Sequence, residues 1–196
     1  MPFPSPPWQL YAQSWLSVFV LRRPGRADRP AGVYAAAFVD YQDRGVLAYH
    51  ELLVARLLRD GRSPRVRVTD IWVDSPESLA GGRSLWAIPK QPAVLPLQDR
   101  PFGPAARTRF SGVTDGRHLA SATFTSLPGA AFLRTPFAAA LTQQREDGSP
   151  VVTSFGGSAR VLPCHGSWLF GGPLSFLRGH RPVVSLRLRD VRLRLG

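Results

Sequence analysis

Lysine and cysteine are almost missing from this chain of 196 residues, and the scarcity of cysteine restricts what the protein can be. The single cysteine, Cys164, excludes an internal disulfide, so a reducing cytoplasm is the expected location. No apolar run approaches the roughly 20 residues that cross a bilayer, and the amino-terminal segment lacks the early positive charge of a secretory signal. The single cysteine and the four histidines have no metal-ligand spacing, so no metal site is expected.

Negative charge is also scarce. The chain has 13 acidic and 25 basic residues, a formal net charge of +12. A positive field favours anionic partners, nucleic acid among them. The arginines are scattered, however, and the sequence has neither zinc-knuckle spacing nor a Gly-rich RNA-binding signature. Nucleic acid is therefore not an expected partner, although a nucleic-acid-associated module stays among the alternatives.

The 19 prolines and 18 glycines divide the chain into short segments, few of which read as long helices. Residues 14–23 and 32–42 are typical of strands, and turns are expected at Asp60-Gly61, at Asp115-Gly116 and within 146–150. We expect one domain over residues 1–196. Its predicted fold class is α+β and mostly antiparallel β: a closed or partly closed β-barrel or cone with one or two short helices.

One good helix signal lies directly before Lys90, the one lysine of the chain. Ser75 suits the N-cap, Pro76 the first helical position, and Glu77 the positive end of the helix dipole. The pair Gly81-Gly82 is expected to stop the helix.

The closing segment, residues 181–196, alternates apolar and basic residues. Its parity flips at Asp190, which predicts a bulge or a bend. Its arginines, Arg187 among them, are interpreted as the exposed face of an edge strand, with anion binding as the alternative.

The one lysine, Lys90, is notable because 24 of the 25 basic residues are arginine. Only lysine loses its proton near neutral pH when buried, and only its amine condenses with a carbonyl group. Lys90 lies in an apolar stretch without an acidic neighbour in sequence, so burial would disfavour its charged form. The neutral amine would attack a ketone and give an iminium, an electron sink for a carbanion or enamine. An exposed loop lysine between two prolines is the alternative.

The triplet Tyr49-His50-Glu51 opens a second apolar stretch. A glutamate leading such a strand can point into a pocket and move protons there, whereas a solvated strand-end glutamate is the alternative. Strand alternation would place His50 on the opposite face from Tyr49 and Glu51, so His50 is not a catalytic candidate.

The segment IWVDSPESLAGGRSLWAIPKQPAV, residues 71–94, resembles the signature of the acetoacetate decarboxylase-like superfamily. In that family a strand ending in Asp leads to a short helix, then Gly-Arg, an aromatic residue and Pro-Lys. Gly82-Arg83, Trp86 and Pro89-Lys90 match in order and spacing. The resemblance implies that Lys90 forms a Schiff base and that Tyr49 and Glu51, in a Tyr-x-Glu pattern, belong to the active site. It also implies a homo-oligomer.

Departures from the family pattern concern polar residues. The family's decarboxylases have a second lysine directly after the first, where this chain has Gln91. Where they have a glutamate after the Gly-Arg pair, this chain has Ser84. The position of an active-site arginine in the family falls near Gln13 of this chain. These differences argue against strict acetoacetate decarboxylation. Related members use the lysine for aldol condensation and dehydration of keto acids, some in natural-product pathways.

We therefore predict a Schiff-base-forming lyase, of decarboxylase or aldolase/dehydratase type, acting on a keto acid or a related carbonyl compound. The predicted catalytic residues are Lys90 and Glu51. The predicted substrate-binding residues are Tyr49, Arg83, Trp86, Gln91 and Gln13. No metal or organic cofactor is expected, because the lysine is itself the electron sink. The main alternative is a non-covalent cyclase, isomerase or ligand-binding protein of a secondary-metabolite pathway.

Overall fold

The computed structural model describes residues 2–24, 29–58, 64–100, 107–126 and 133–196. Its elements are β1 (Trp8–Leu21), β2 (Gly32–Gln42), β3 (Tyr49–Leu58), β4 (Arg65–Val73), α1 (Pro76–Trp86), β5 (Lys90–Pro92), β6 (Leu97–Arg100), β7 (Arg107–Thr114), β8 (Arg117–Ser126), β9 (Arg134–Gln144), β10 (Pro150–Phe170), the 3-10 helix η1 (Gly172–Leu177) and β11 (Val184–Leu195). Strands dominate, and the predicted fold class is confirmed.

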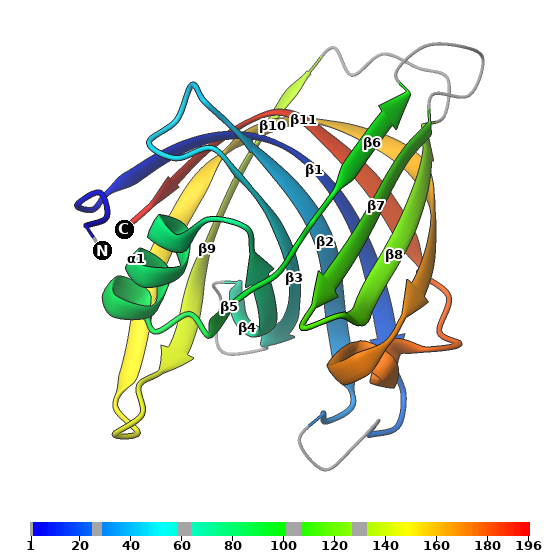
Figure 1. Ribbon diagram of the computed structural model, residues 1–196, viewed down its shortest axis with the longest axis horizontal. Helices are drawn as coiled ribbons and strands as arrows, with labels where there is room; N and C mark the ends of the chain where they lie inside the picture. The colour runs from blue at the N-terminus through cyan, green and yellow to red at the C-terminus, as the bar shows by residue number, and fades with distance from the viewer. Residues whose placement is uncertain (1, 25–28, 59–63, 101–106, 127–132) are drawn as a thin grey trace.

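Seven strands close into a ring in the order β11, β1, β2, β3, β4, β9 and β10 (Figure 1). The ring closes because β10 pairs with β11 as well as with β9. Its neighbours are antiparallel except for a short parallel contact between β4 and β9. The long strand β10 also joins the ring to a second sheet, because its residues 164–170 pair with β8, which continues to β7 and β6.

Strand β2 is buried on both faces because it lies between two hydrophobic cores. On one face Phe38 stacks on Phe110 of β7, with ring centroids 4.5 Å apart, and so fastens the ring to the second sheet. On the other face Tyr41 belongs to the core inside the ring. Strand β3 alternates in the same way, so that Tyr49 and Glu51 point into the ring.

The predicted turns agree with the observed strand pairs. Asp115 and Gly116 both take positive φ, 47° and 70°, which is the conformation a two-residue hairpin turn requires. The segment 146–150 connects β9 to β10. The Asp60-Gly61 turn lies outside the described residues, although β3 and β4 pair antiparallel on either side of it.

The final strand, β11, differs from its predicted environment. The predicted bulge is confirmed, because Asp190 takes φ 49° and the register shifts there against both β1 and β10. The interpretation as an edge strand is wrong, since closure of the ring pairs β11 on both sides. Arg187 is only 8% exposed, and its guanidinium lies over the ring of Trp15 at 5.0 Å.

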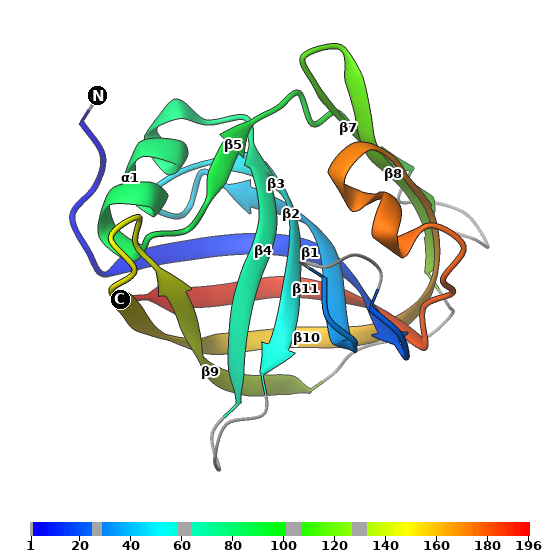
Figure 2. The ribbon, with the colours of Figure 1, turned by 90° about the horizontal axis from the view of Figure 1, so that it is seen from below.

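Helix α1 lies beside both chain termini at one end of the ring, whereas η1 lies against the second sheet (Figures 1 and 2). In the described part of the chain, neither helix is long and apolar enough to cross a membrane. The lysine singled out by the sequence begins β5, the short strand that follows α1 and pairs with β4.

Candidate active site

Helix α1 begins as predicted but ends later. The Ser75 hydroxyl caps it by accepting a hydrogen bond from the backbone N–H of Ser78 at 3.1 Å, and Pro76 is its first residue. The predicted stop at Gly81-Gly82 is wrong, because the helix continues to Trp86. The reason is close packing: both glycines are buried where no side chain would fit.

Gly82 lets α1 lie directly against the side chain of Lys90. A Cβ atom at this position would be 2.7 Å from Cδ and 2.8 Å from Cε of Lys90, closer than real Cβ contacts come. After the helix, Ala87 takes the left-handed conformation with φ 53°, and the chain turns back into the sheet. Lys90 then pairs with Ile71 of β4, which fixes the direction of its side chain toward the ring interior.

The amine of Lys90 is buried in a small polar cluster. The residue is only 3% exposed. Its Nζ donates hydrogen bonds to Ser78 Oγ at 2.7 Å, to Glu51 Oε2 at 2.9 Å and to the Tyr49 hydroxyl at 3.2 Å. The three N–H groups of an ammonium therefore each have an acceptor, and one of the acceptors is a carboxylate.

Two tyrosines hold the carboxylate of Glu51. Tyr41 donates to Oε1 and Tyr49 to Oε2, each at 3.3 Å, and their rings stack 4.5 Å apart across the β2–β3 pair. Burial, and next the negative charge of Glu51, raise the pKa of both phenols well above its ordinary value. Both hydroxyls therefore stay protonated at physiological pH and remain hydrogen-bond donors.

This arrangement differs from the sequence expectation of a lysine without an acidic partner. Glu51 is 39 residues away in sequence, yet the ring brings its carboxylate to the amine. The carboxylate lies 2.9 Å from the amine, so the two groups form a buried ion pair. The pair also supplies a route for proton transfer between the two groups, which an isolated amine would lack.

A small cavity of about 70 Å³ lies beside the pair. Its polar walls are Tyr41, Tyr49, Glu51 and Lys90. Its apolar walls are Trp8, Leu10, Leu53, Val68, Ile71, Ile88 and Leu195. The cavity is well below the roughly 300–1,000 Å³ of pockets for drug-sized ligands, so it fits only a small molecule or one end of a larger one.

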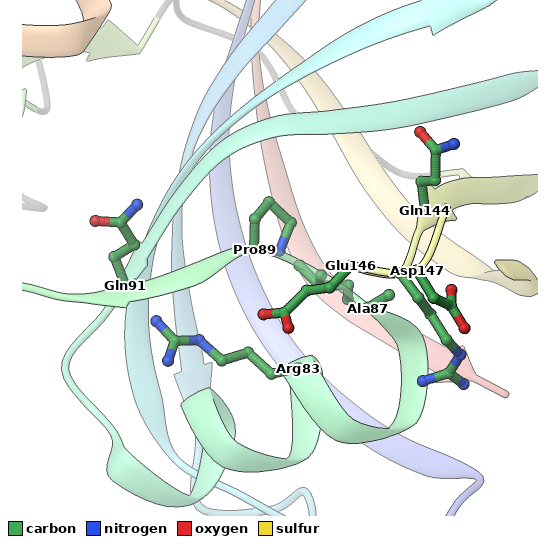
Figure 3. Close-up of a pocket in the computed structure, with 9 residues that line it drawn as sticks. Arg83, Ala87, Pro89, Gln91, Gln144, Glu146 and Asp147 are labelled. Carbon is green, nitrogen blue, oxygen red and sulfur yellow. The ribbon is translucent and has the colours of Figure 1, made fainter. Parts of the chain in front are cut away.

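A larger and more open pocket of about 680 Å³ lies outside the ring, between α1, β5 and the β9–β10 turn (Figure 3). Arg83, Gln91 and Glu146 line it. Ile88 lines both this pocket and the inner cavity, so its side chain lies between them. Ile88 therefore marks a boundary between the buried site and the outer pocket.

The predicted substrate-binding residues divide into two groups. The structure brings Tyr49 to the amine directly, and Arg83 only through the backbone, since its Nε donates to the Lys90 carbonyl at 2.7 Å. Gln91 follows Lys90 in a strand and so points outward, where it is exposed (Figure 3). The other two, Trp86 and Gln13, also lie away from the inner cavity.

Trp86 and Gln13 each contact a different part of the molecule. Trp86 packs edge-on against Trp8, with centroids 4.7 Å apart, and it is Trp8 that lines the cavity. Gln13 alternates with an inward-facing neighbour on β1 and accepts a hydrogen bond from Arg187 at 3.1 Å, on the face of the second sheet.

Two residues of the cluster were not among the sequence predictions, namely Ser78 and Tyr41. Ser78 lies inside the matched segment, but nothing in its spacing separates it from the neighbouring helix residues. Tyr41 has one usable signal: pairing residues 32–42 with the strand that starts at Tyr49 places the two tyrosines directly opposite each other.

His50 lies on the opposite face of β3 from Glu51, as alternation predicts. Asp74 binds it twice, accepting from the His50 backbone N–H at 2.7 Å and contacting ring Nδ1 at 2.9 Å. The hydrogen bond to Asp74 raises the pKa of His50, against the opposing effect of burial. Burial alone would raise the pKa of Asp74, but the hydrogen bonds from His50 lower it overall.

This pair makes the stability of the fold depend on pH. The raised pKa of His50 stabilises the fold fully below 6.5, the ordinary pKa of histidine. The lowered pKa of Asp74 stabilises it fully above 3.8, the ordinary pKa of aspartate. We expect the unfolding free energy of the native protein, minus that of His50→Gln, to be largest between these values and to fall as pH rises through the His50 pKa. Chemical denaturation from about pH 5 to pH 9 measures this, with exposed His180→Gln as control. A pH-independent difference would contradict the prediction.

No group of three or more His, Cys, Asp or Glu side chains gathers into a metal-binding arrangement within the described ranges. The buried thiol of Cys164 is free, and burial raises its pKa to about 11, so it is protonated and unreactive at neutral pH. The Lys90–Glu51 cluster is accordingly the candidate site with a chemical function.

The seven-stranded ring is the fold of acetoacetate decarboxylase-like proteins, and the Lys90–Glu51 pair lies buried inside it. A family model described as "Acetoacetate decarboxylase (ADC)" matches residues 26–145, and the chain belongs to this family. That match contains Tyr41, Glu51, Ser78 and Lys90, so the whole cluster lies inside the family region.

Solved structures of the same fold include MppR, an enduracididine biosynthesis enzyme, in complex with pyruvate. It has a TM-score of 0.70 and 18% identity over 98% of this chain and 89% of that one. An acetoacetate decarboxylase from Legionella pneumophila has a TM-score of 0.65 and 15% identity, over 98% of this chain and 85% of that one. An acetoacetate decarboxylase-like enzyme from Sphingomonas wittichii RW1 has a TM-score of 0.65 and 16% identity, over 98% and 92%. A sequence search of curated proteins finds no match.

Proposed function

We propose that this protein is a Schiff-base-forming lyase that acts through Lys90 on a keto acid or a related carbonyl compound, as a decarboxylase or as an aldolase/dehydratase. The observation that carries the proposal is the 2.9 Å contact between the buried Lys90 Nζ and Glu51 beside a small cavity. Membership of the family supports it, and so does the pyruvate complex of MppR, since pyruvate is a keto acid.

The first step in this mechanism prepares the nucleophile. A proton passes from the ammonium of Lys90 to the carboxylate of Glu51 along their hydrogen bond, leaving a neutral amine. The nitrogen lone pair then attacks the carbonyl carbon, and the carbonyl oxygen takes the proton from Glu51. The carboxylate next removes a proton from the nitrogen, which gives a neutral carbinolamine.

The second step forms the electron sink. Glu51 returns its proton to the carbinolamine hydroxyl, water leaves, and the nitrogen lone pair completes the C=N bond of an iminium. The electrons of a neighbouring C–C or C–H bond then move into the iminium and give an enamine. In a decarboxylase the departing group is carbon dioxide; in an aldolase Glu51 removes a proton from the α-carbon. Protonation or attack on a second carbonyl, followed by hydrolysis, frees Lys90.

The remaining residues act by position. Tyr41 and Tyr49 hold the Glu51 carboxylate by donating to both of its oxygens, and Ser78 accepts from the amine. Arg83 is a positioning residue, because it binds the Lys90 backbone from outside the cavity. No step in this proposed route calls for a metal or an organic cofactor.

The setting of the enzyme is part of the same proposal. We propose one domain over residues 1–196, a cytoplasmic location and a homo-oligomer, and a role in secondary metabolism such as the biosynthetic context of MppR. The free Cys164 thiol is compatible with a reducing compartment. Light scattering of the purified protein would measure the subunit count.

Borohydride trapping tests the proposal. The protein is incubated with acetoacetate, pyruvate and longer keto acids, reduced, and digested for peptide mass spectrometry. Because Lys90 is the one lysine, the Lys90→Arg variant contains no lysine at all and reports any non-specific background. An adduct on Lys90 supports the Schiff-base route. Absence of an adduct with every compound, while a family decarboxylase is trapped in parallel, contradicts it.

Gly82→Ala is expected to slow trapping at Lys90 by at least about tenfold, because the new methyl group displaces the lysine side chain and small displacements of reacting groups are costly. Alanine is the better helix former by about 1 kcal/mol, so loss of helix is not the cause. The rate of adduct formation and the unfolding temperature measure the two effects separately. Ser84→Ala, at an exposed position of α1, is the control. Trapping at the native rate would disprove the positioning role.

Ile88→Ala is expected to speed trapping of longer ketones by about tenfold or more relative to acetone, because it joins the inner cavity to the outer pocket. The substitution also creates a void and costs about 2–5 kcal/mol of stability. Trapping rates for a homologous series of methyl ketones measure the effect. Leu53→Ala enlarges the same cavity away from the outer pocket and is the matched control. Equal effects of both variants would contradict access past Ile88.

A further inference from the structure

The charges of the inner cavity limit the kind of carbonyl compound that it can hold. Among the described residues lining the cavity, Lys90 is the only cation and Glu51 the only anion, and the two are paired at 2.9 Å. Arg83, in the last turn of α1, lines the outer pocket instead and donates its Nε to the Lys90 carbonyl. No cation on these walls is left to pair with a carboxylate of the substrate.

The hydrogen-bond donors of the cavity are engaged in the same way. Tyr41 and Tyr49 donate to the two oxygens of Glu51, and Lys90 donates to three acceptors. The other walls are apolar side chains. A carboxylate entering this cavity would therefore lose its hydration, meet no free donor and lie beside a second carboxylate. Burial of an unpaired charge is among the most unfavourable changes a protein site undergoes.

The charge balance through the reaction leads to the same conclusion. With an uncharged substrate the cavity is neutral at every step: ammonium with carboxylate, amine with carboxylic acid, and iminium with carboxylate. With a keto acid it carries one uncompensated negative charge at every one of these steps. Because the cavity has a volume of only about 70 Å³, the group that reaches Lys90 must also be small.

From these observations we infer that the compound condensing with Lys90 is a small uncharged aldehyde or ketone and not a keto acid. The inference rests on the proposed Schiff-base function and narrows its substrate class. With no carboxylate to lose, the iminium is converted to the enamine by transfer of an α-proton to Glu51. The enamine carbon then attacks the carbonyl carbon of a second aldehyde or ketone, whose oxygen takes that proton. Hydrolysis of the resulting iminium releases a β-hydroxy carbonyl compound, or its enone if water is also lost.

Matched pairs of carbonyl compounds test the inference. Pyruvate and pyruvamide have nearly the same shape and differ in charge, and acetoacetate and acetoacetamide form a second pair. Each is trapped with borohydride on the native protein at one pH. A lysine-containing peptide in the same tube corrects for intrinsic reactivity. We expect the amide of each pair to modify Lys90 at least about tenfold faster than the acid, relative to the peptide.

The Glu51→Gln variant separates charge from shape. It removes the second carboxylate with little change of volume, so the preference for the amide over the acid should narrow by several-fold. Acids that react as fast as their amides in the native protein, or a preference unchanged in Glu51→Gln, would overturn the inference while leaving the Schiff-base function intact. No adduct on Lys90 with any of the four compounds would instead overturn the proposed function, and this inference with it.

Discussion

Lys90→Arg should reduce turnover by at least about 10³-fold and leave no adduct after borohydride reduction, because the covalent route depends on the one primary amine in the site. Arginine keeps the positive charge beside Glu51 but stays protonated and does not condense with a carbonyl group. The change therefore removes the chemistry while retaining the electrostatics of the cluster. Product formation from the best-trapped compound, followed with native and variant protein at equal concentration, measures the loss.

The main complication is the size of arginine, since Gly82 already touches the lysine side chain. A second variant, Lys90→Met with Glu51→Gln, replaces the buried ion pair by neutral groups of similar volume, a change that is often neutral for stability. Its unfolding temperature should stay near that of the native protein while its activity is lost. Full activity in either variant would show that the protein works without covalent chemistry, as a non-covalent cyclase, isomerase or binding protein.

Glu51→Gln should have the second largest effect, and it should separate formation of the adduct on Lys90 from the proton transfers needed for turnover. The amide cannot take up or return a proton, so turnover is expected to fall about 10²–10⁴-fold. The lysine loses its buried counter-charge, which lowers the free energy of unfolding by about 3–5 kcal/mol. The primary amine that attacks the carbonyl group is still present in this variant, so borohydride should still trap an adduct on Lys90.

Single-turnover measurements distinguish the two parts of this prediction. Adduct formation is followed by mass spectrometry and product release by absorbance, both with excess enzyme. Glu146→Gln, an exposed glutamate at the rim of the outer pocket, is the matched control and should leave both rates unchanged. Loss of adduct and product in equal measure would mean that Glu51 is needed to form the imine and not only to move protons after it.

The fold was largely predictable because its signals are local. Pro and Gly spacing divides the chain into strands, and the turns at Asp115-Gly116 and 146–150 join the strands expected on either side. The parity change at Asp190 located a bulge to the residue. The helix end was predicted wrongly for a physical reason: glycine also occurs inside a helix where another side chain must pass at contact distance, and sequence does not distinguish the two uses.

The sequence by itself determined which residues are candidates for the chemistry of the site. One lysine among 25 basic residues, preceded by a short capped helix and matched by a Tyr-x-Glu triplet, is enough to propose an amine nucleophile and a proton carrier. These signals can be read from the sequence because each depends only on residue type and on short spacing along the chain. The mostly antiparallel architecture follows from the same kind of local pattern.

Only the tertiary structure decided which groups meet. Glu51 reaches Lys90 across 39 residues because β3, β4 and β5 are neighbours in the ring, and Tyr41 joins them through the β2–β3 register. The same geometry turns Gln91 outward, directs Gln13 to the second sheet and buries Arg187. Whether a side chain enters a cavity depends on which strands pair with each other. Strands that are far apart in sequence pair only because the whole ring packs together, and a local sequence pattern does not show this.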